Sequence, residues 1–403
     1  MKKERSLRNK SDLSEIHRST IVKILQRKEI CSRAEIAKIT GLTQAAITKL
    51  VAALIDEGIV LEEGIIQGSG NRRAIGLRLN AEAKRVIGVK FARHVFEVGV
   101  FDISGKFYCS KATEFALDED TGKVIAAMKR RIYELLEKDG HVVAIGFALP
   151  GPYLREEGRI AMVTRMPVWH NINFIDEFRE EFDKPVFIEQ DANAGALAEY
   201  WFGDHDATGR SLAYLLVGDG VGAGIVEKGN LLLGRQGAAG ELGHISIDVN
   251  GPRCECGNYG CLELYCSAPV MIKIAKERMP KLISDGIPHR TDECGIIFEA
   301  ARKGNQKALA LTKEIAEYVG YGCVSLINGY NPDIIVIGDR ISQGRELILP
   351  TVMQVVKDRC IKELYENTEI KISGLKADSV LYGAAAIATD RVLSNPSVYL
   401  TTN

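Results

Sequence analysis

The chain has 403 residues, of which 46% are hydrophobic and 26% are charged, and its net charge is −1. This length is too great for one small core, so we expect two or three domains. No apolar run reaches the length of a membrane span. The basic start at residues 1–5 has no apolar segment behind it, so we expect that it is not a secretory signal. With nine cysteines, an odd number, we expect a protein of the reducing cytoplasm that has no membrane contact and no disulfide framework.

The small net charge hides an asymmetry between the two ends of the chain. Residues 1–80 hold 15 Lys and Arg against 9 Asp and Glu, a balance of +6, and the other residues hold 37 against 44, a balance of −7. A basic module joined to an acidic body indicates that a polyanion meets the first module. The excess charge alone is also compatible with a solvated face, so the local pattern has to decide.

The basic module begins with the pattern of a helix-turn-helix. Residues 16–27 read as a helix with apolar side chains at helical spacing. Ser32 is a good N-cap and Glu35 follows three residues later, which predicts a capping box. Gly41 then ends this second helix in the position after its last residue.

A third helix and a wing complete the predicted module. Thr43 caps a helix that runs to about residue 56, with an apolar face. Two short strands, at residues 59–61 and 76–79, flank a glycine-rich tip at 67–73 that carries two arginines. The sequence therefore predicts a winged helix-turn-helix over residues 1–80.

The third helix is expected to enter the major groove of double-stranded DNA with its first turns. Gln pairs with adenine, Thr or Ala packs on a thymine methyl group, and Lys reaches guanine or phosphate. Arginine on the supporting helix suits phosphate, and arginine on the wing suits the minor groove or the backbone. The expected DNA contacts are Arg33, Thr43, Gln44, Ala45, Thr48, Lys49, Arg72 and Arg73. A helical hairpin used for protein contacts is the alternative.

From residue 86 the pattern changes to alternating strands and helices, which predicts an α/β body in two lobes. Strands are expected at residues 86–89, 96–101, 142–148, 186–188, 212–217 and 334–337, and helices at 122–138, 174–182 and 307–327. We find no repeat of fixed period. The first ten residues and residues 394–403 are expected to be loose.

One cluster has the composition and spacing of a structural zinc site. Three thiolates and one imidazole form a set that closes a tetrahedral Zn²⁺ site, and they come from His244, Cys254, Cys256 and Cys261. Gly257 and Gly260 allow the tight turns that bring three sulfurs to one ion. Cysteines also serve as small buried hydrophobic residues, and this is how we interpret the others: Cys31, Cys109, Cys266, Cys294, Cys323 and Cys360.

These features in this order resemble the ROK family, which groups bacterial sugar kinases with sugar-responsive repressors. The motifs that carry the resemblance are Ser32-Arg33-Ala34-Glu35, Gly70-Asn71-Arg72-Arg73, Pro150-Gly151-Pro152, Asp191-Ala192-Asn193-Ala194, Gly218-Asp219-Gly220, Glu241-Leu242-Gly243-His244, the cysteine cluster, Asn331-Pro332-Asp333 and Gly383-Ala384-Ala385-Ala386. The resemblance implies a two-lobed, actin-like (ribonuclease H-like) body that associates as a homodimer or homotetramer. We place its first lobe at residues 81–200, its second lobe at 201–390 and a C-terminal tail at 391–403.

The resemblance also implies a sugar site. Asp191 matches the catalytic base of the family's kinases, Glu241 and Glu263 match acceptors of sugar hydroxyls, and His244 would face the sugar with one ring nitrogen and zinc with the other. Gln190 and Arg165 stand where family kinases have Asn near the sugar. Arg165 could favour an acidic or phosphorylated sugar; a solvated loop arginine is the alternative, as a helix N-cap is for Asp191.

The phosphate-binding motifs depart from the family pattern. The acidic, glycine-rich stretch after the first strand is replaced by residues 90–94, beginning with Lys90, and both of its glycines are gone. Asp219 replaces a hydroxyl donor, and Asp339 and Arg340 follow Gly338 where the family usually has another glycine. Phosphoryl transfer depends on positioning phosphate and neutralising its charge.

We therefore expect no catalytic residues and no enzyme activity. The predicted function is a DNA-binding repressor that releases an operator when a sugar or sugar derivative binds between the lobes. The main alternative is a sugar kinase that retains ATP-dependent phosphorylation. An activator, or a repressor controlled by a partner protein, is a third possibility.

Overall fold

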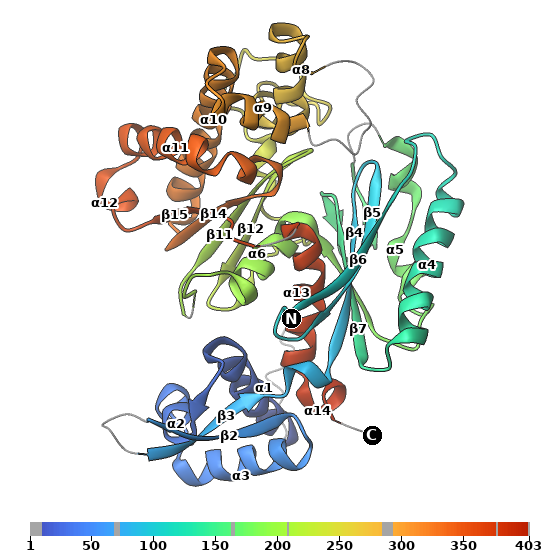
Figure 1. Cartoon of the computed structure of the whole chain (residues 1–403), viewed down its shortest axis with the longest axis vertical. Coiled ribbons are helices and arrows are strands. Elements are labelled where there is room, and N and C mark those ends of the chain that lie inside the picture. Colours follow the sequence, from blue (N-terminus) through green and yellow to red (C-terminus); the bar gives the residue numbers. More distant parts are fainter. Residues whose placement is uncertain are drawn as a thin grey trace, which may run out of the picture.

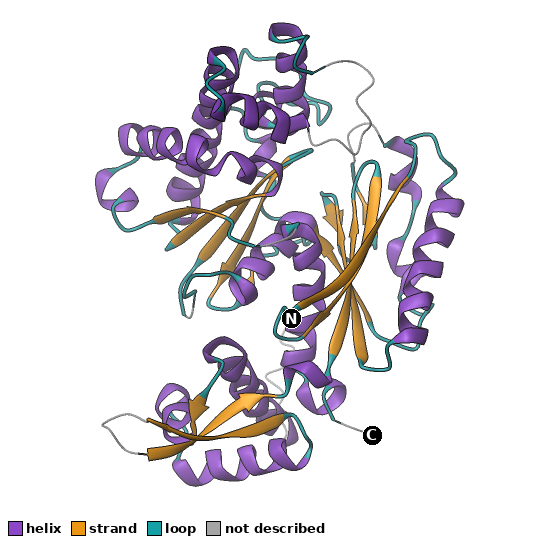
Figure 2. Ribbon diagram, in the orientation of Figure 1, coloured by secondary structure: helices purple, strands orange, loops and turns teal. Residues whose placement is uncertain are grey.

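The computed structural model describes residues 10–67, 73–162, 166–207, 209–283, 293–375 and 378–401. A small domain, made of the described residues between 10 and 80, lies at one end of the molecule, and two α/β lobes stand side by side above it (Figure 1). The expected mixed α/β architecture with an N-terminal winged helix is thus present. Helices cover the sheets of both lobes (Figure 2). The predicted Arg72 and Arg165 lie outside the described residues.

The small domain is a winged helix-turn-helix. Its elements are α1 (Lys10–Lys28), β1 (Cys31–Ser32), α2 (Arg33–Thr40), α3 (Gln44–Asp56), β2 (Val60–Gln67) and β3 (Arg73–Leu79), and its antiparallel sheet has the order β1-β3-β2. The capping box is present, because Glu35 N–H donates to Ser32 Oγ (3.3 Å) while Ser32 N–H donates to Glu35 Oε2 (2.8 Å). Gly41, at φ 71°, ends α2, and the chain bends by 118° before α3.

The first lobe is built on a sheet of five strands in the order β10-β7-β4-β5-β6. An antiparallel meander is formed by β4 (Arg85–Phe91), β5 (Val95–Asp102) and β6 (Phe107–Glu114). Two strands are added in parallel beside β4, namely β7 (Val142–Leu149) and β10 (Val186–Gln190). Helices α4 (Thr121–Lys138) and α5 (Phe174–Phe178) and the small hairpin of β8 (Tyr153–Leu154) and β9 (Arg159–Ile160) belong to this lobe. A helix was expected over residues 174–182, but α5 ends at Phe178.

The second lobe repeats this plan. Its sheet has the order β13-β12-β11-β14-β15. As in the first lobe, the first three strands in chain order (β11, β12 and β13) form an antiparallel meander, and the last two (β14 and β15) are added in parallel beside the first strand. The strands are β11 (Leu212–Val217), β12 (Val221–Glu227), β13 (Asn230–Leu231), β14 (Ile334–Gly338) and β15 (Glu369–Ile372). The helices are α7 (Glu263–Cys266), α8 (Ala268–Arg278), α9 (Glu293–Arg302), α10 (Gln306–Tyr330), α11 (Arg345–Arg359) and α12 (Lys362–Tyr365). This structural repeat was not visible in the sequence.

Two helices join the parts of the molecule. Helix α6 (Asp191–Phe202) and helix α13 (Ser379–Ser394) pack against each other, α6 also against β12 and α13 against β4 and β7. The contact with the sheet is close: a Cβ built on Gly146 of β7 would lie 1.9 Å from the Ala384 carbonyl oxygen. The last helix of the expected second lobe, residues 201–390, thus packs on the sheet of the first lobe. Buried side chains of α6, α13 and the winged helix form one continuous hydrophobic cluster.

The expectation of a loose C-terminus is wrong for the described part of residues 394–403. Helix α14 (Pro396–Tyr399) follows α13, Ser397 N–H donates to Glu15 of α1 (2.9 Å), and Leu400 is buried. Apolar contact and this hydrogen bond fix the segment against α1. Cys109, expected to be buried, is exposed on β6. Among the described residues no single helix is long and apolar enough to cross a membrane; the bent pair α2 and α3 meets the length and composition requirement together.

Candidate ligand pocket, metal centre and nucleic-acid interface

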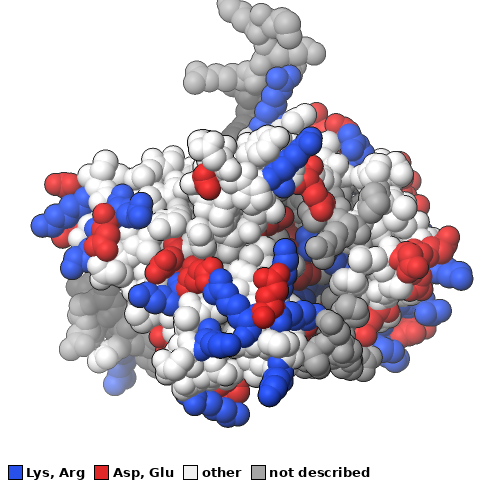
Figure 3. Space-filling model, turned by 90° about the horizontal axis from the view of Figure 1, so that it is seen from above, with Lys and Arg blue, Asp and Glu red and all other residues white. Residues whose placement is uncertain are grey.

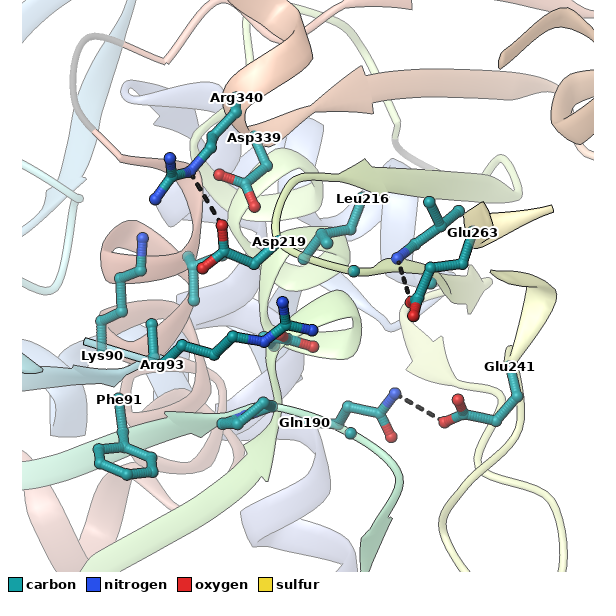
Figure 4. Close-up of a pocket in the computed structure, with 18 of the residues that line it drawn as sticks. Lys90, Phe91, Arg93, Gln190, Leu216, Asp219, Glu241, Glu263, Asp339 and Arg340 are labelled. Atoms are coloured by element: carbon teal, nitrogen blue, oxygen red, sulfur yellow. Dashed lines mark hydrogen bonds and ion pairs between the residues drawn. The ribbon is translucent and has the colours of Figure 1, made fainter. Parts of the chain in front are cut away.

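A pocket between the two lobes collects most of the predicted ligand residues. It is lined by Gln190, Asp191, Glu241, His244 and Glu263, which come from separate segments of the chain. Figure 4 shows Gln190, Glu241 and Glu263 among them. Asp191 is the first residue of α6, directly after β10, and Glu241 and His244 flank a turn of 3₁₀ helix. The ends of strands in α/β sheets commonly carry such ligand residues.

The carboxyl group of Asp191 is held at the base of the pocket. Its Oδ1 accepts the N–H of Ala192 (2.7 Å), so it does not cap the helix in the ordinary way by reaching a residue further along. Burial raises the pKa of Asp191 to about 7, and the nearby charges of Asp339 and Glu241 add to this. A carboxylate removed from water in this way gains by accepting hydrogen bonds from ligand hydroxyl groups.

Two further carboxylates are positioned by hydrogen bonds within the pocket. Gln190 Nε2 donates to Glu241 Oε1 (2.9 Å), which leaves the other oxygen of Glu241 for a ligand (Figure 4). Burial raises the pKa of Glu241. Glu263 Oε2 accepts the N–H of Val221 (3.0 Å), and this bond links the carboxylate side of the pocket to the hairpin between β11 and β12.

The four predicted metal ligands come together beside the pocket. Their ligand atoms all lie within 4.8 Å of one another, with 3.6 Å between the sulfurs of Cys256 and Cys261 and 3.8 Å between Cys254 Sγ and His244 Nδ1. Metal–sulfur bonds of about 2.3 Å in a tetrahedron place ligand atoms roughly 3.8 Å apart, so this geometry can hold a metal ion. Burial raises the pKa of the Cys261 thiol to about 12, so a cation would be needed to keep it as thiolate.

The opposite side of the pocket carries the altered phosphate motifs, and ion pairs hold them. The ammonium group of Lys90 contacts the carboxylate of Asp378, the N-cap of α13, and Arg340 Nε lies 3.3 Å from Asp219 Oδ1 (Figure 4). Burial lowers the pKa of Lys90, but Asp378 and Asp339 outweigh this and raise it above its usual value. The sequence analysis missed Asp378, whose only local signal is its N-cap position before an apolar run.

Asp339 keeps the backbone of the glycine it replaces. Its φ is 65°, in the left-handed region that a non-glycine residue rarely adopts. A Cβ built on Gly218 would lie 1.8 Å from Asp339 Oδ2, so this carboxylate fills the space against the hairpin turn between β11 and β12. Burial raises the pKa of Asp339 to about 6. A phosphate group approaching this turn would meet Asp339 and Asp219.

The predicted DNA-contacting residues of α3 share one exposed side of the helix. Its opposite side, formed by Ile47, Val51 and Leu54, is buried. The exposed residues at its start are Thr43, Gln44, Ala45, Thr48 and Lys49. The hydroxyl group of Thr48 donates to the carbonyl of Gln44 (2.8 Å), so its methyl group is left for contacts.

Of the predicted arginines, Arg73 is exposed at the start of β3, whereas Arg33 pairs with Glu62 of β2 (2.9 Å). This pair neutralises part of the charge that sequence analysis assigned to phosphate contact. Seen from the end that carries α8 and α10, the body mixes acidic and basic side chains (Figure 3). That end of the body therefore presents no broad basic face to a polyanion.

Comparison with known proteins agrees with this architecture. A sequence profile described as ROK family matches residues 86–391, and one described as winged helix-turn-helix DNA-binding matches residues 16–60. The chain belongs to the ROK family. It is 30% identical to the xylose repressor of Caldicellulosiruptor bescii over 404 residues, which cover 96% of this chain and 99% of that protein. The resemblance inferred from the motifs is confirmed.

Two further matches differ in whether they include the winged helix. The glucokinase of Thermotoga maritima is 32% identical over 318 residues, which cover 76% of this chain and 98% of that enzyme. A solved ROK family transcriptional regulator, described as a homolog of the E. coli MLC protein, superimposes with a TM-score of 0.76 at 26% identity, covering 95% of this chain and 97% of that one. The match to the regulator takes in nearly the whole chain, whereas the match to the kinase leaves about a quarter of it uncovered.

Proposed function

We propose that this ROK protein is a sugar-responsive, DNA-binding transcriptional repressor whose body binds its inducer and does not transfer phosphate. One observation carries this proposal: a winged helix-turn-helix is joined to a pocket whose carboxylate side is open to a ligand and whose phosphate side is held by ion pairs. The similarity to a xylose repressor over nearly the whole chain supports it.

The sugar-binding residues we propose are Gln190, Asp191, Glu241, His244 and Glu263, with Arg165 as a further candidate. Carboxylates accept hydrogen bonds from vicinal hydroxyl groups, and a buried polar site discriminates strongly against a ligand that lacks one of them. We propose zinc as the metal of the cysteine cluster. Its role is structural: it would fix the ring and tautomer of His244 so that the second nitrogen faces the sugar.

Two helices connect this pocket with the winged helix. Helix α6 begins at Asp191 and carries Tyr200 and Trp201 in its last turn. The guanidinium of Arg27 in α1 stacks on both rings, 3.7 Å from the centre of the Tyr200 ring. Helix α13 begins after Asp378, and near its end Asp390 lies 3.3 Å from Lys23 Nζ of α1. A sugar that binds open and closed lobes unequally would move both helix ends against α1.

On DNA, we propose that two copies of the chain read two half-sites with their α3 helices, a helical turn or a multiple apart. Gln44, Thr43, Ala45 and Thr48 would face base edges, and Lys49, Arg33, Arg72 and Arg73 would contact phosphate, guanine or the minor groove. A homodimer or a homotetramer provides the paired modules.

The test is operator binding with and without sugar. DNA sites selected from random sequence are bound to the purified full chain at fixed salt, and affinity is measured across pentoses, hexoses, amino sugars and their phosphates. We expect one ligand class to weaken operator binding about tenfold or more. A sugar that binds but leaves operator affinity unchanged would remove the inducer mechanism, and sugar-dependent ATP consumption would favour the kinase alternative.

Substitutions in α3 separate base reading from phosphate contact. Gln44→Ala is expected to cost about 1–3 kcal/mol and to relax specificity at one base pair, whereas Lys49→Ala should weaken binding to all sequences and reduce the salt dependence by about one counterion. Lys111→Ala, an exposed lysine on β6, is the control and should change neither. Unaltered specificity in Gln44→Ala would exclude Gln44 from base reading.

A further inference from the structure

A second cavity, of about 380 Å³, lies behind the ligand pocket, at the edge of the first sheet. Strand β10 separates the two: Glu189 lines the second cavity, and the next two residues, Gln190 and Asp191, line the ligand pocket. Residues from α5, α13, α14 and β13 complete its walls, so both lobes and the C-terminal helices meet there.

Three arginines from different elements converge on this cavity, and we call it the arginine pocket. Arg155 follows β8, Arg179 follows α5, and Arg391 lies in α13. Arg155 pairs with the buried carboxylate of Glu189, yet its Nε is buried and has no hydrogen-bond partner among the described residues. Arg179 and Arg391 are exposed and make no ion pair with any described residue.

The charges lining the arginine pocket are not balanced. The carboxylate of Glu189 forms an ion pair with Arg155, and the other acidic residue of the lining, Asp390, forms an ion pair with Lys23 of α1. Arg155 and Arg391 line the same cavity. Burial lowers the pKa of Arg155, and the positive charge of Arg391 adds to this. An anion between them would offset both positive charges.

We propose that the arginine pocket binds a small anion that carries a phosphate group, at a site distinct from the sugar pocket. Planar guanidinium groups bind phosphate through paired hydrogen bonds. The rings of Tyr153, Phe187 and Tyr399 line the cavity and limit its occupant to a small molecule. The described lining of the ligand pocket has five acidic residues against three Lys and Arg, and that of the arginine pocket has two acidic residues against three Arg, so the arginine pocket is the more favourable site for an anion.

The position of the arginine pocket gives such an anion access to the joint with the winged helix. Arg391 is the neighbour of Asp390, which holds Lys23, and Tyr399 belongs to the short helix that hydrogen-bonds Glu15 through Ser397. A bound phosphate would draw Arg391 toward the cavity and compete with the contacts that Asp390 makes with α1.

The test is thermal unfolding and calorimetric titration of the full chain with inorganic phosphate, with chloride at matched ionic strength as the reference. Glycerol phosphate forms a second arm that distinguishes a phosphate monoester from free phosphate. The variant Arg179→Gln/Arg391→Gln removes two exposed side chains, and Arg130→Gln, an exposed arginine of α4, is the matched control.

We expect a saturable rise in melting temperature with phosphate or with the monoester, weakened about tenfold or more in the double variant and unchanged in the control. An equal response of wild type and double variant would overturn the proposal, as would no response beyond that of chloride. Binding of an acidic peptide in place of either phosphate compound would also overturn it, because the occupant would then be a protein segment.

Discussion

The two sides of the ligand pocket use similar side chains for opposite purposes. On the sugar side, Asp191 and Glu241 keep carboxylate oxygens available at the cavity, and burial raises the pKa of both groups. On the phosphate side, each of the acidic groups Asp219 and Asp378 is matched with a basic group. Among the described residues, no basic side chain pairs with Asp191 or Glu241, and we infer that this leaves both carboxylates to accept hydrogen bonds from a ligand.

The two lobes have the same strand topology, and in both of them the hairpin turn after the first strand departs from the phosphate-binding pattern of the family's kinases. Each sheet begins with a hairpin whose turn reaches the pocket, at residues 92–94 in the first lobe and 218–220 in the second. The second turn keeps Gly218 and Gly220, but Asp339 fills the space beside Gly218. The first turn has Ala92, Arg93 and His94 and no glycine. We therefore expect neither turn to let its backbone approach a phosphate closely, for a different reason in each lobe.

The strongest test of the sugar side is Asp191→Asn. Replacing a charge-assisted acceptor by an amide should lower sugar affinity about 100-fold, because such hydrogen bonds contribute about 1.5–3 kcal/mol. Titration calorimetry with the inducing sugar measures this, and Asp118→Asn, an exposed position, is the control. Retained affinity in Asp191→Asn would mean that the sugar binds elsewhere.

Loss of the metal should weaken sugar binding through His244. Cys261→Ser is expected to release the bound metal and to weaken sugar binding about tenfold or more, because His244 loses the bond that orients its ring. Metal content is measured by elemental analysis beside sugar affinity. Cys109→Ser, an exposed cysteine outside the cluster, should retain both. Full sugar affinity in a metal-free Cys261→Ser protein would contradict the dual role of His244.

The ligand-free protein should lose stability as pH rises. The pKa of Asp191 is raised in the folded state to about 7 from an unfolded value of 3.8, so its stabilising contribution is complete below about pH 4 and is lost as pH rises through about 7. Urea unfolding between these values should show a decline on the order of a few kcal/mol. In Asp191→Asn, the unfolding free energy should change much less with pH. An identical decline in that variant would mean that other groups, among them Asp339, cause the pH dependence.

The smallest effects are expected on the phosphate side. Asp219→Asn breaks a pair whose side chains are 29% and 39% exposed, so the change in unfolding free energy should stay below about 1 kcal/mol. Sugar affinity should remain within about twofold of wild type, and ATP consumption should not appear. A large loss of sugar affinity would show that the two sides of the pocket are energetically coupled and would contradict their separate roles.

Local sequence patterns were sufficient to predict the winged helix and the cluster of four side chains that could hold a metal ion. Ser32, Glu35 and Gly41 act within a few residues of one another, so the capping box and the glycine stop are recognisable before any fold is known. The same holds for the cysteines at 254, 256 and 261, whose spacing already restricts them to one turn-rich loop. These features depend on short-range geometry alone.

Only the tertiary structure decided which distant groups neutralise one another. Lys90 and Asp378 are 288 positions apart, and no local pattern relates Asp219 to Arg340. The same limit explains why the repeated sheet order and the return of α13 to the first lobe were missed, since strand order and helix packing follow from burying whole faces. The sequence alone determined the chemistry that each segment can offer, and long-range packing determined which carboxylates remain free to bind a ligand.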